Sequence, residues 1–339
     1  MNKTYEVVVN KHQNMLIIGK GANNFSVGEI RFEKDPNVVR SEYGQSDLSD
    51  AFALAKAMGA PYVFVMNVRK NDDYFKALDL VKVQDFAYVA FASLYLSDTF
   101  VTAYDGGLQH YYFSYFLGTM GLNNLTTIIA TDKHAVLYEN VDKFITDMNK
   151  IVENIKAACT SRAAKQNLIC VGNNLSSTKY GAVALAASLC TADVKDYPSI
   201  DIGDAVFDID HYDNPGDWAY FKQHADGSIT IENLLNILEG GPDKVVFFNR
   251  ILNYIRRGID FSEYRGKPYT KYRKLCIMET LKNYLEELHG VIIQHYEIMS
   301  VKAYRPQDET GVVEVKTYFQ VWPIGCLESC QIEKGVDLI

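Results

Sequence analysis

The sequence lacks a long apolar run. Nowhere in its 339 residues does an apolar stretch reach the roughly 20 residues that a membrane-spanning helix needs. The first residues, MNKTYEVVVNKHQ, also lack the apolar core of a secretory signal peptide. We therefore expect a protein that is made in a cytoplasm and is not inserted into a membrane.

Cysteine is sparse and scattered. Of the six cysteines, only Cys326 and Cys330 lie close together, in a C-x-x-x-C pair without neighbouring histidines. Four of the six occupy apolar or helical segments, where a free thiol behaves as a small buried hydrophobe. This pattern argues against a disulfide framework and against a structural zinc site. We expect no metal and no cofactor.

Catalytic motifs are missing as well. No serine or cysteine lies in a G-x-S-x-G context, and the loop GKGANNF at residues 19–25 lacks the third glycine of a dinucleotide-binding fingerprint. The acidic segment 208–213, which contains His211, lacks the glycine and closing glutamate of a calcium loop. We read both as ordinary loops and predict a protein that is not an enzyme. The alternative is a soluble α/β enzyme that binds a nucleotide or a metal at one of them.

The residues that are present favour a globular α/β protein. Hydrophobic residues make up 48% of the chain and charged residues 22%. Apolar runs such as YVFVMNV at 62–68 and TTIIAT at 126–131 do not alternate, which is typical of strands in a parallel sheet that helices cover on both faces. We expect a helix at 48–58, capped by Ser46 or Asp47 and ended by Gly59, immediately before the first of these strands.

Further elements follow from the same patterns. We expect strands at residues 5–9, 15–18, 28–32, 86–92, 125–130, 167–171, 245–248, 291–296, 298–304 and 312–322. We expect helices at residues 72–80, 108–117, 141–158, 180–189, 229–238 and 268–289. Between Thr191 and Gly227 the pattern weakens and aspartates crowd the chain, which indicates a boundary or a long surface excursion.

A basic segment stands out near the C-terminal end. Residues 244–282 contain ten basic and three acidic side chains, a net charge of +7, whereas the whole chain carries −8 and the remainder therefore −15. The predicted helix that begins at Pro268 has an apolar stripe only in its second half. Lys267, Lys271, Arg273 and Lys274 belong to its first half. We expect this half of the helix to bind an acidic partner. The simpler alternative is a solvated helix face without a partner.

Aromatic residues are abundant, with 23 tyrosines and 17 phenylalanines. Several lie in segments that we expect at the surface, including YYFSYF at 111–116 and the three tyrosines Tyr264, Tyr269 and Tyr272. Exposed aromatic residues near arginine are typical of the centres of protein interfaces. The sequence therefore indicates assembly with other subunits.

Three stretches resemble the contractile tail sheath proteins of phages and of related injection machines such as R-type tailocins. They are YGQSDLSDAFALAKAMGAPYVFVMNV, KYGAVALAASLCTADV, and VVFFNRILNYI followed by YTKYRKLCIMETLKNYLEELHG. They occur in the family's order, and the resemblance spans about residues 15 to 322. The chain is short for a sheath, and its ending is only approximately the usual one, which leaves a terminator or ring protein of the same family open.

The resemblance implies a fold and four segments. It implies a layered α/β outer domain and an inner α+β domain with extended terminal strand arms. The corresponding boundaries are 1–20 for the N-terminal arm, 21–225 for the α/β domain, 226–310 for the inner domain with the basic helix, and 311–339 for the C-terminal arm. The arm residues that would pair with neighbouring subunits are Tyr5, Val7, Val9, Leu327 and Ile332.

The resemblance also implies a role. Such a subunit polymerises into a helical tube around an inner tail tube and contracts to drive that tube through the host envelope, without a nucleotide. Its partners would be further copies of itself, the tail tube protein, and the baseplate and tail terminator proteins, with no nucleic acid and no membrane insertion. It would reside in a virion tail assembled in the host cytoplasm. Lys267, Lys271, Arg273 and Lys274 would face the tube.

Overall fold

The computed structural model divides the protein into two compact units, which we call the sheet unit (residues 1–193 and 198–249) and the hairpin unit (194–197 and 250–339). It describes residues 12–70, 73, 80–81, 86–95, 125–131, 146, 149–150, 152–153, 155–157, 162–172, 180–194, 199–200, 218–240, 245–304 and 313–324. The expected boundary at 225/226 therefore differs from the observed one at 249/250.

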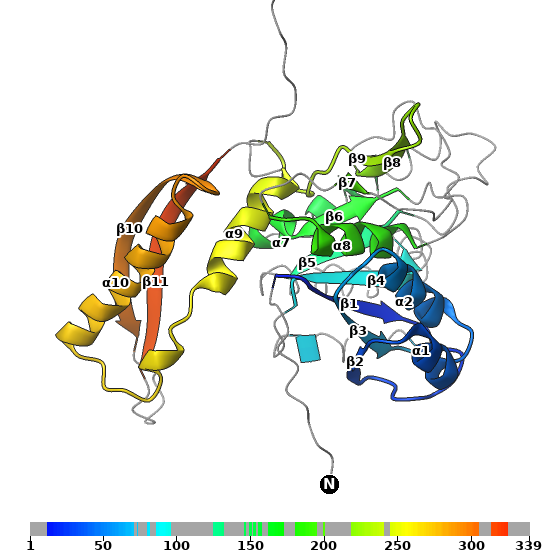
Figure 1. Ribbon diagram of the computed structural model, residues 1–339, viewed down its shortest axis with the longest axis horizontal. Coiled ribbons are helices and arrows are strands. Elements are labelled where there is room, and N and C mark those ends of the chain that lie inside the picture. The colour runs from blue at the N-terminus through cyan, green and yellow to red at the C-terminus, as the bar shows by residue number, and fades with distance from the viewer. Residues whose placement is uncertain are drawn as a thin grey trace, which may run out of the picture. The chain divides into compact units, whose positions relative to one another are not determined.

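A six-stranded mixed sheet forms the centre of the sheet unit (Figure 1). Its strand order is β2-β3-β1-β4-β5-β6, and all neighbours are parallel except β2, which runs antiparallel to β3. The strands are β1 (Asn14–Gly19), β2 (Ile30–Glu33), β3 (Tyr62–Asn67), β4 (Tyr88–Tyr95), β5 (Thr126–Ala130) and β6 (Leu168–Val171). The predicted α/β class is confirmed.

Strand β1 is buried along its whole length because both faces of the sheet are covered. Met15 and Ile17 belong to a core with α1 (Pro36–Tyr43), α2 (Asp47–Ala57) and α8 (Gly181–Thr191). Leu16 and Ile18 belong to the opposite core, which also contains Phe86, Val152 and Ile155. Residues 14–19, expected in an N-terminal arm, are therefore the middle of the sheet.

Local sequence explains the helices that cover the sheet. Ser46 caps α2 by accepting a hydrogen bond from the Ser49 amide, and Gly59 ends the turn after the helix with a φ of +82°. Every residue of α8 except Thr191 is buried, and its alanines allow close packing on the strands. Helix α1 was not predicted, although Asp35 followed by Pro36 is a typical helix start.

Two predicted elements are wrong. Residues 229–238 are not a helix: β9 (Ile229–Glu232) lies between β7 (Ser199–Ile200) and β8 (Tyr220–Gln223) in an antiparallel sheet. Ile229 and Ile231 are buried and alternate with half-buried residues, which is the period of a strand. Residues 245–248 are not a strand, because α9 (Val246–Gly258) begins there and buries Phe247, Ile251 and Ile255 at a spacing of four.

The hairpin unit consists of the last part of α9, the 3₁₀ turn η3 (Ser262–Tyr264), α10 (Lys271–Leu288), β10 (Ile293–Tyr304) and β11 (Glu314–Pro323). The sequence predicted two strands at 291–296 and 298–304, but the structure has one continuous strand there, β10. Its register with β11 shifts between Ile298 and Ser300. The sheet unit also contains the short helix α7 (Arg162–Gln166).

We predict that Ser46→Ala lowers the free energy of unfolding of the sheet unit by about 1 kcal/mol, because the cap of α2 loses its side-chain acceptor. Urea denaturation measures the change. Ser41→Ala is the matched control, because Ser41 is exposed within α1 and the same substitution there removes no cap. Equal effects of the two substitutions would contradict the capping role.

Candidate assembly interface

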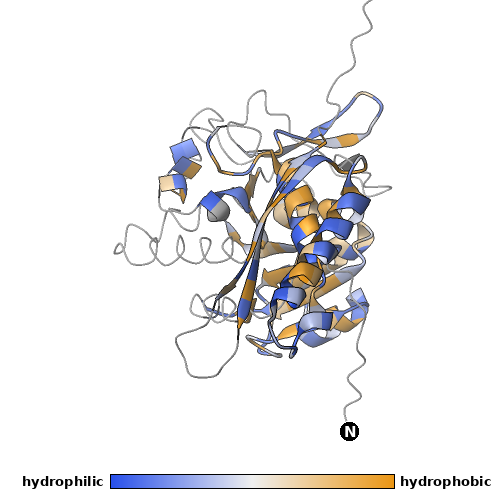
Figure 2. Ribbon diagram, turned by 90° about the vertical axis from the view of Figure 1, so that its left-hand side faces the viewer, coloured by the Kyte–Doolittle hydropathy of each residue, from blue (hydrophilic) through white to orange (hydrophobic). Residues whose placement is uncertain are grey.

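The long β-hairpin presents two chemically different faces. Strands β10 and β11 pair antiparallel, so that Val301 lies opposite Thr317 on one face and Ser300 lies opposite Tyr318 on the other. Helix α10 packs along β10 through its buried stripe of Ile277, Leu281 and Leu285. Hydrophilic and hydrophobic residues mix along the hairpin, in contrast to the apolar strands of the large sheet (Figure 2).

Both edges of the hairpin are open within the described residues. Strands β10 and β11 form a two-stranded sheet of twelve and ten residues there, and the one further pairing is an isolated bridge between His289 and Ile293, at the first residue of β10. Each strand therefore presents a row of backbone amide and carbonyl groups to its outer side. Such edges are the acceptors in β-strand addition, in which another chain extends the sheet.

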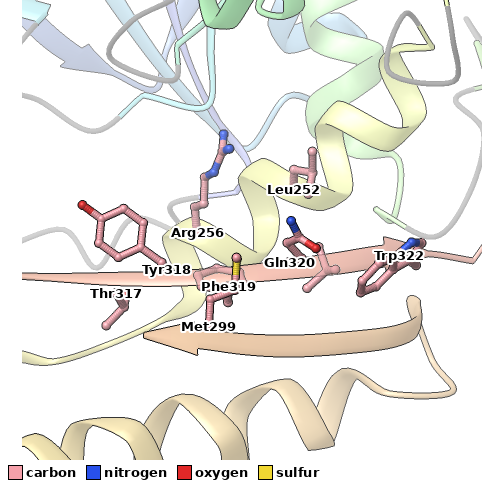
Figure 3. Close-up of a pocket in the computed structure, with 9 residues that line it drawn as sticks. Leu252, Arg256, Met299, Thr317, Tyr318, Phe319, Gln320 and Trp322 are labelled. Atoms are coloured by element: carbon pink, nitrogen blue, oxygen red, sulfur yellow. The ribbon is translucent and has the colours of Figure 1, made fainter. Parts of the chain in front are cut away.

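Aromatic residues and lysines cover the face of the hairpin opposite α10. The His295 and Trp322 rings lie 4.9 Å apart, and the Tyr304 and Tyr318 hydroxyls are 2.7 Å apart. Lys302 lies 5.4 Å from the Tyr318 ring centre. Figure 3 shows the pocket of about 560 Å³ where part of this face lies beside α9, with Leu252, Met299, Gln320 and Trp322 among its lining residues.

The structure separates the four predicted tube-facing residues. Helix α10 begins at Lys271 instead of Pro268, because the Thr270 hydroxyl accepts a hydrogen bond from the Arg273 amide, and Lys267 therefore precedes the helix. Lys267 and Lys271 are exposed, whereas Lys274 is half-buried. The guanidinium carbon of half-buried Arg273 lies 5.6 Å from the Tyr264 ring centre. Arg273 thus stabilises the connection that precedes α10.

Helices α9 and α10 approach each other closely at one point. The Tyr284 side chain of α10 occupies the space where a Cβ atom on Gly258 would lie, so a larger residue at position 258 would have to displace this side chain. Burial raises the pKa of Tyr284 to about 12. The packing therefore holds a neutral phenol against the end of α9.

The glycine loop at 19–25 is engaged by the protein itself. The Lys20 amide donates to Ser93 Oγ at 2.9 Å, the Gly21 amide to Asn67 Oδ1 at 2.8 Å, and the Ala22 amide to the Tyr43 carbonyl at 2.7 Å. A phosphate cradle needs such amides unpaired. This geometry gives the nucleotide-binding alternative no support at this loop.

The other predicted sites have different outcomes. Residues 208–213 and the arm residues Tyr5, Val7, Val9, Leu327 and Ile332 lie outside the described residues. Within the described part, no group of three histidine, cysteine or acidic side chains is arranged to hold a metal ion. No helix there is long and apolar enough to cross a bilayer. The exposure expected for Tyr272 is confirmed, whereas Tyr264 and Tyr269 are half-buried.

We predict that Asn67→Ala lowers the free energy of unfolding by about 2–3 kcal/mol. The fully buried Asn67 side chain accepts from the Gly21 amide and donates to the Asn23 and Phe25 carbonyls, and the substitution removes all three hydrogen bonds. Chemical denaturation measures the loss. Asn24→Ala is the control, because Asn24 is exposed in the same loop and should change stability by less than about 0.5 kcal/mol.

Comparison with known proteins reveals no sequence relative. No protein-family model matches the chain. No curated protein matches it either.

Solved structures, in contrast, match almost the whole chain. A chain of the anti-feeding prophage baseplate aligns with a TM-score of 0.65 at 10% identity, covering 97% of this chain and 94% of that one. A chain of the sheath complex of an extracellular contractile injection system, PVC, in the contracted state aligns with a TM-score of 0.64 at 11% identity, covering 96% and 92%.

A sheath tail protein from Listeria innocua aligns with a TM-score of 0.57 at 13% identity, covering 90% of this chain and 94% of that protein. The resemblance noted in the sequence is therefore supported by three-dimensional similarity over both units. The chain has the fold of contractile sheath proteins.

Proposed function

We propose that this protein is a structural subunit of a contractile tail sheath. It polymerises into a helical tube around an inner tail tube and contracts to drive the tube through a host envelope. The observation that carries the proposal is the alignment with sheath chains over 90–96% of this chain, the hairpin unit included. Its place is a virion tail or a related injection machine, assembled in the host cytoplasm.

Strand addition is the proposed connection between subunits. The open edges of β10 and β11 suit strands from the arms of two neighbours, and Tyr5, Val7 and Val9 of one arm and Leu327 and Ile332 of the other are the proposed donors. Because donor and acceptor surfaces differ, the contact is heterologous and extends into a helical assembly. Main-chain pairing of this kind lets subunits rearrange during contraction while they remain linked.

The start of α10 is the proposed tube attachment site. Lys267 and Lys271 are exposed there, and Arg273 and Lys274 contribute positive charge from half-buried positions. This charge contrasts with the net −15 of the chain outside residues 244–282. An acidic tube surface is therefore the proposed partner. Contraction needs no nucleotide, because the extended sheath is a metastable state that relaxes when the baseplate triggers it.

A ring protein at the end of the tail is the second candidate. The alignment with a baseplate chain, at a TM-score of 0.65, is as good as the alignments with sheath chains at 0.63 and 0.64. A subunit at the baseplate or at the terminator would use the same strand addition. It would close into rings and would not extend into tubes.

Electron microscopy of the purified full-length chain tests these alternatives. We expect helical tubes if the protein is a sheath subunit and isolated rings if it is a ring protein. A monodisperse small particle whose melting temperature rises with a nucleotide or a metal would contradict both.

Removing residues 324–339 provides the matched variant. We expect a folded subunit that forms no extended sheath, because the donor strand with Leu327 and Ile332 is lost while β11 is retained. Circular dichroism checks folding, and tube length on the grid checks assembly. Normal tubes from the shortened chain would contradict the assignment of the C-terminal arm.

We further predict that the triple substitution Lys267→Glu, Lys271→Glu and Lys274→Glu weakens attachment to the tail tube by at least about tenfold in low salt, because it reverses the sign of the attachment site. Co-sedimentation of subunits with tail tubes measures binding. Lys302→Glu with Lys316→Glu is the control on the hairpin, outside the proposed site. Unchanged binding by the triple variant would argue against this attachment site.

A further inference from the structure

Two apolar side chains lie on the solvent face of α10 at its basic end. Tyr272 is 72% exposed and Leu275 is 56% exposed, and they are three residues apart, on neighbouring positions of one helix face. The buried stripe of Ile277, Leu281 and Leu285 lies on the other side of the helix. Neither exposed residue therefore contributes to the core of the hairpin unit.

Tyr272 has a polar neighbour on its own helix. Interaction with the Cys276 thiol, one turn further along, raises the pKa of the Tyr272 hydroxyl. The Tyr272 ring stays open to solvent. A tyrosine with few rotamers to lose is the type of anchor that carries binding energy at protein interfaces.

Positive charge is concentrated on the N-terminal side of this pair, whereas exposed Glu279 lies on its C-terminal side. Residues 265–278 contain the five basic side chains Arg265, Lys267, Lys271, Arg273 and Lys274 and no acidic one. None of the five forms an ion pair within the described residues. The surface thus has an apolar centre with a cationic border on its N-terminal side. Its complement is an apolar recess with carboxylates on the side that meets these basic residues, because interface centres exclude charge while their rims carry it.

We infer that Tyr272 and Leu275 form the centre of the tube attachment surface, and that the tube presents an apolar recess bordered by acidic side chains. The inference rests on the proposed sheath function, and it adds an apolar contribution to the proposed electrostatic attachment. An attachment made by lysines alone disappears at high salt, because a Debye length of about 3 Å at 1 M screens exposed charges. Burial of Tyr272 and Leu275 adds a contribution that salt does not remove.

The test uses full-length subunits and tail tubes purified from the same tails, in co-sedimentation at about 0.1 M and about 1 M NaCl. We expect wild-type subunits to retain binding at the higher salt. The variant Tyr272→Ser with Leu275→Ser should lose that retained binding and weaken low-salt binding by at least about tenfold. The exposed Val291, which is 53% exposed outside this surface, provides the control Val291→Ser, which should bind like wild type.

A second variant keeps the result interpretable. Tyr272→Phe retains the ring and removes the hydroxyl, so it should keep most of the salt-resistant binding. Two results would overturn the inference: wild-type binding that vanishes at high salt, or full binding by the double serine variant. If the subunits still assembled into a normal sheath, the proposed function would stand. Wild-type subunits that form no sheath in electron micrographs would overturn the proposed function and this inference with it.

Discussion

A two-stranded sheet can satisfy only half of its backbone hydrogen-bonding groups, and this constraint governs the hairpin unit. Strands β10 and β11 gain one covered face from α10, yet their outer edges pair with no further strand in the described structure. An isolated hairpin of this kind is marginally stable in water. Additional strands from other subunits would satisfy the edges and stabilise the unit at the same time. Folding and assembly are therefore linked in the proposed sheath.

The sheet unit has the opposite character. Parallel neighbours flank β1 on both sides, helices cover one face, and a second apolar core fills the other. Within the described residues the six strands of the large sheet pair side by side, and the glycine loop after β1 uses three successive amides within the fold. The sheet unit thus provides a buried core, whereas the hairpin unit provides the surfaces on which the proposed assembly and attachment depend.

The sequence predicted the buried sheet well because its signals are local. Non-alternating apolar runs at β3 and β5 and the Ser46 cap of α2 each depend on a few adjacent residues. Two errors arose where short apolar runs fit both periods, at Val246–Gly258 and at Ile229–Glu232. There the contacts with distant segments decide the outcome. The start of α10 was misplaced because Pro268 suits a first helical position, whereas the Thr270 cap sets the observed start.

In the candidate site, too, some features follow from adjacent residues and others from contacts with distant segments. The basic composition of residues 244–282 is visible in the sequence. Which of these residues face solvent depends on the rotation of α10 about its axis and on the contact between Arg273 and the Tyr264 ring. The exposure of Leu275 could be recognised only once the buried stripe had set that rotation. The contact of Tyr284 with Gly258 likewise joins α10 to a residue 26 positions earlier.

The contact between Tyr284 and Gly258 makes the stability of the hairpin unit depend on pH. A tyrosine in an unfolded chain ionises near pH 10, whereas Tyr284 keeps its proton to about pH 12. Its contribution to stability is complete below pH 10 and is lost as the pH rises through about 12. The junction of α9 and α10 is thereby sensitive to alkali, because deprotonation of one buried phenol weakens the packing between the two helices.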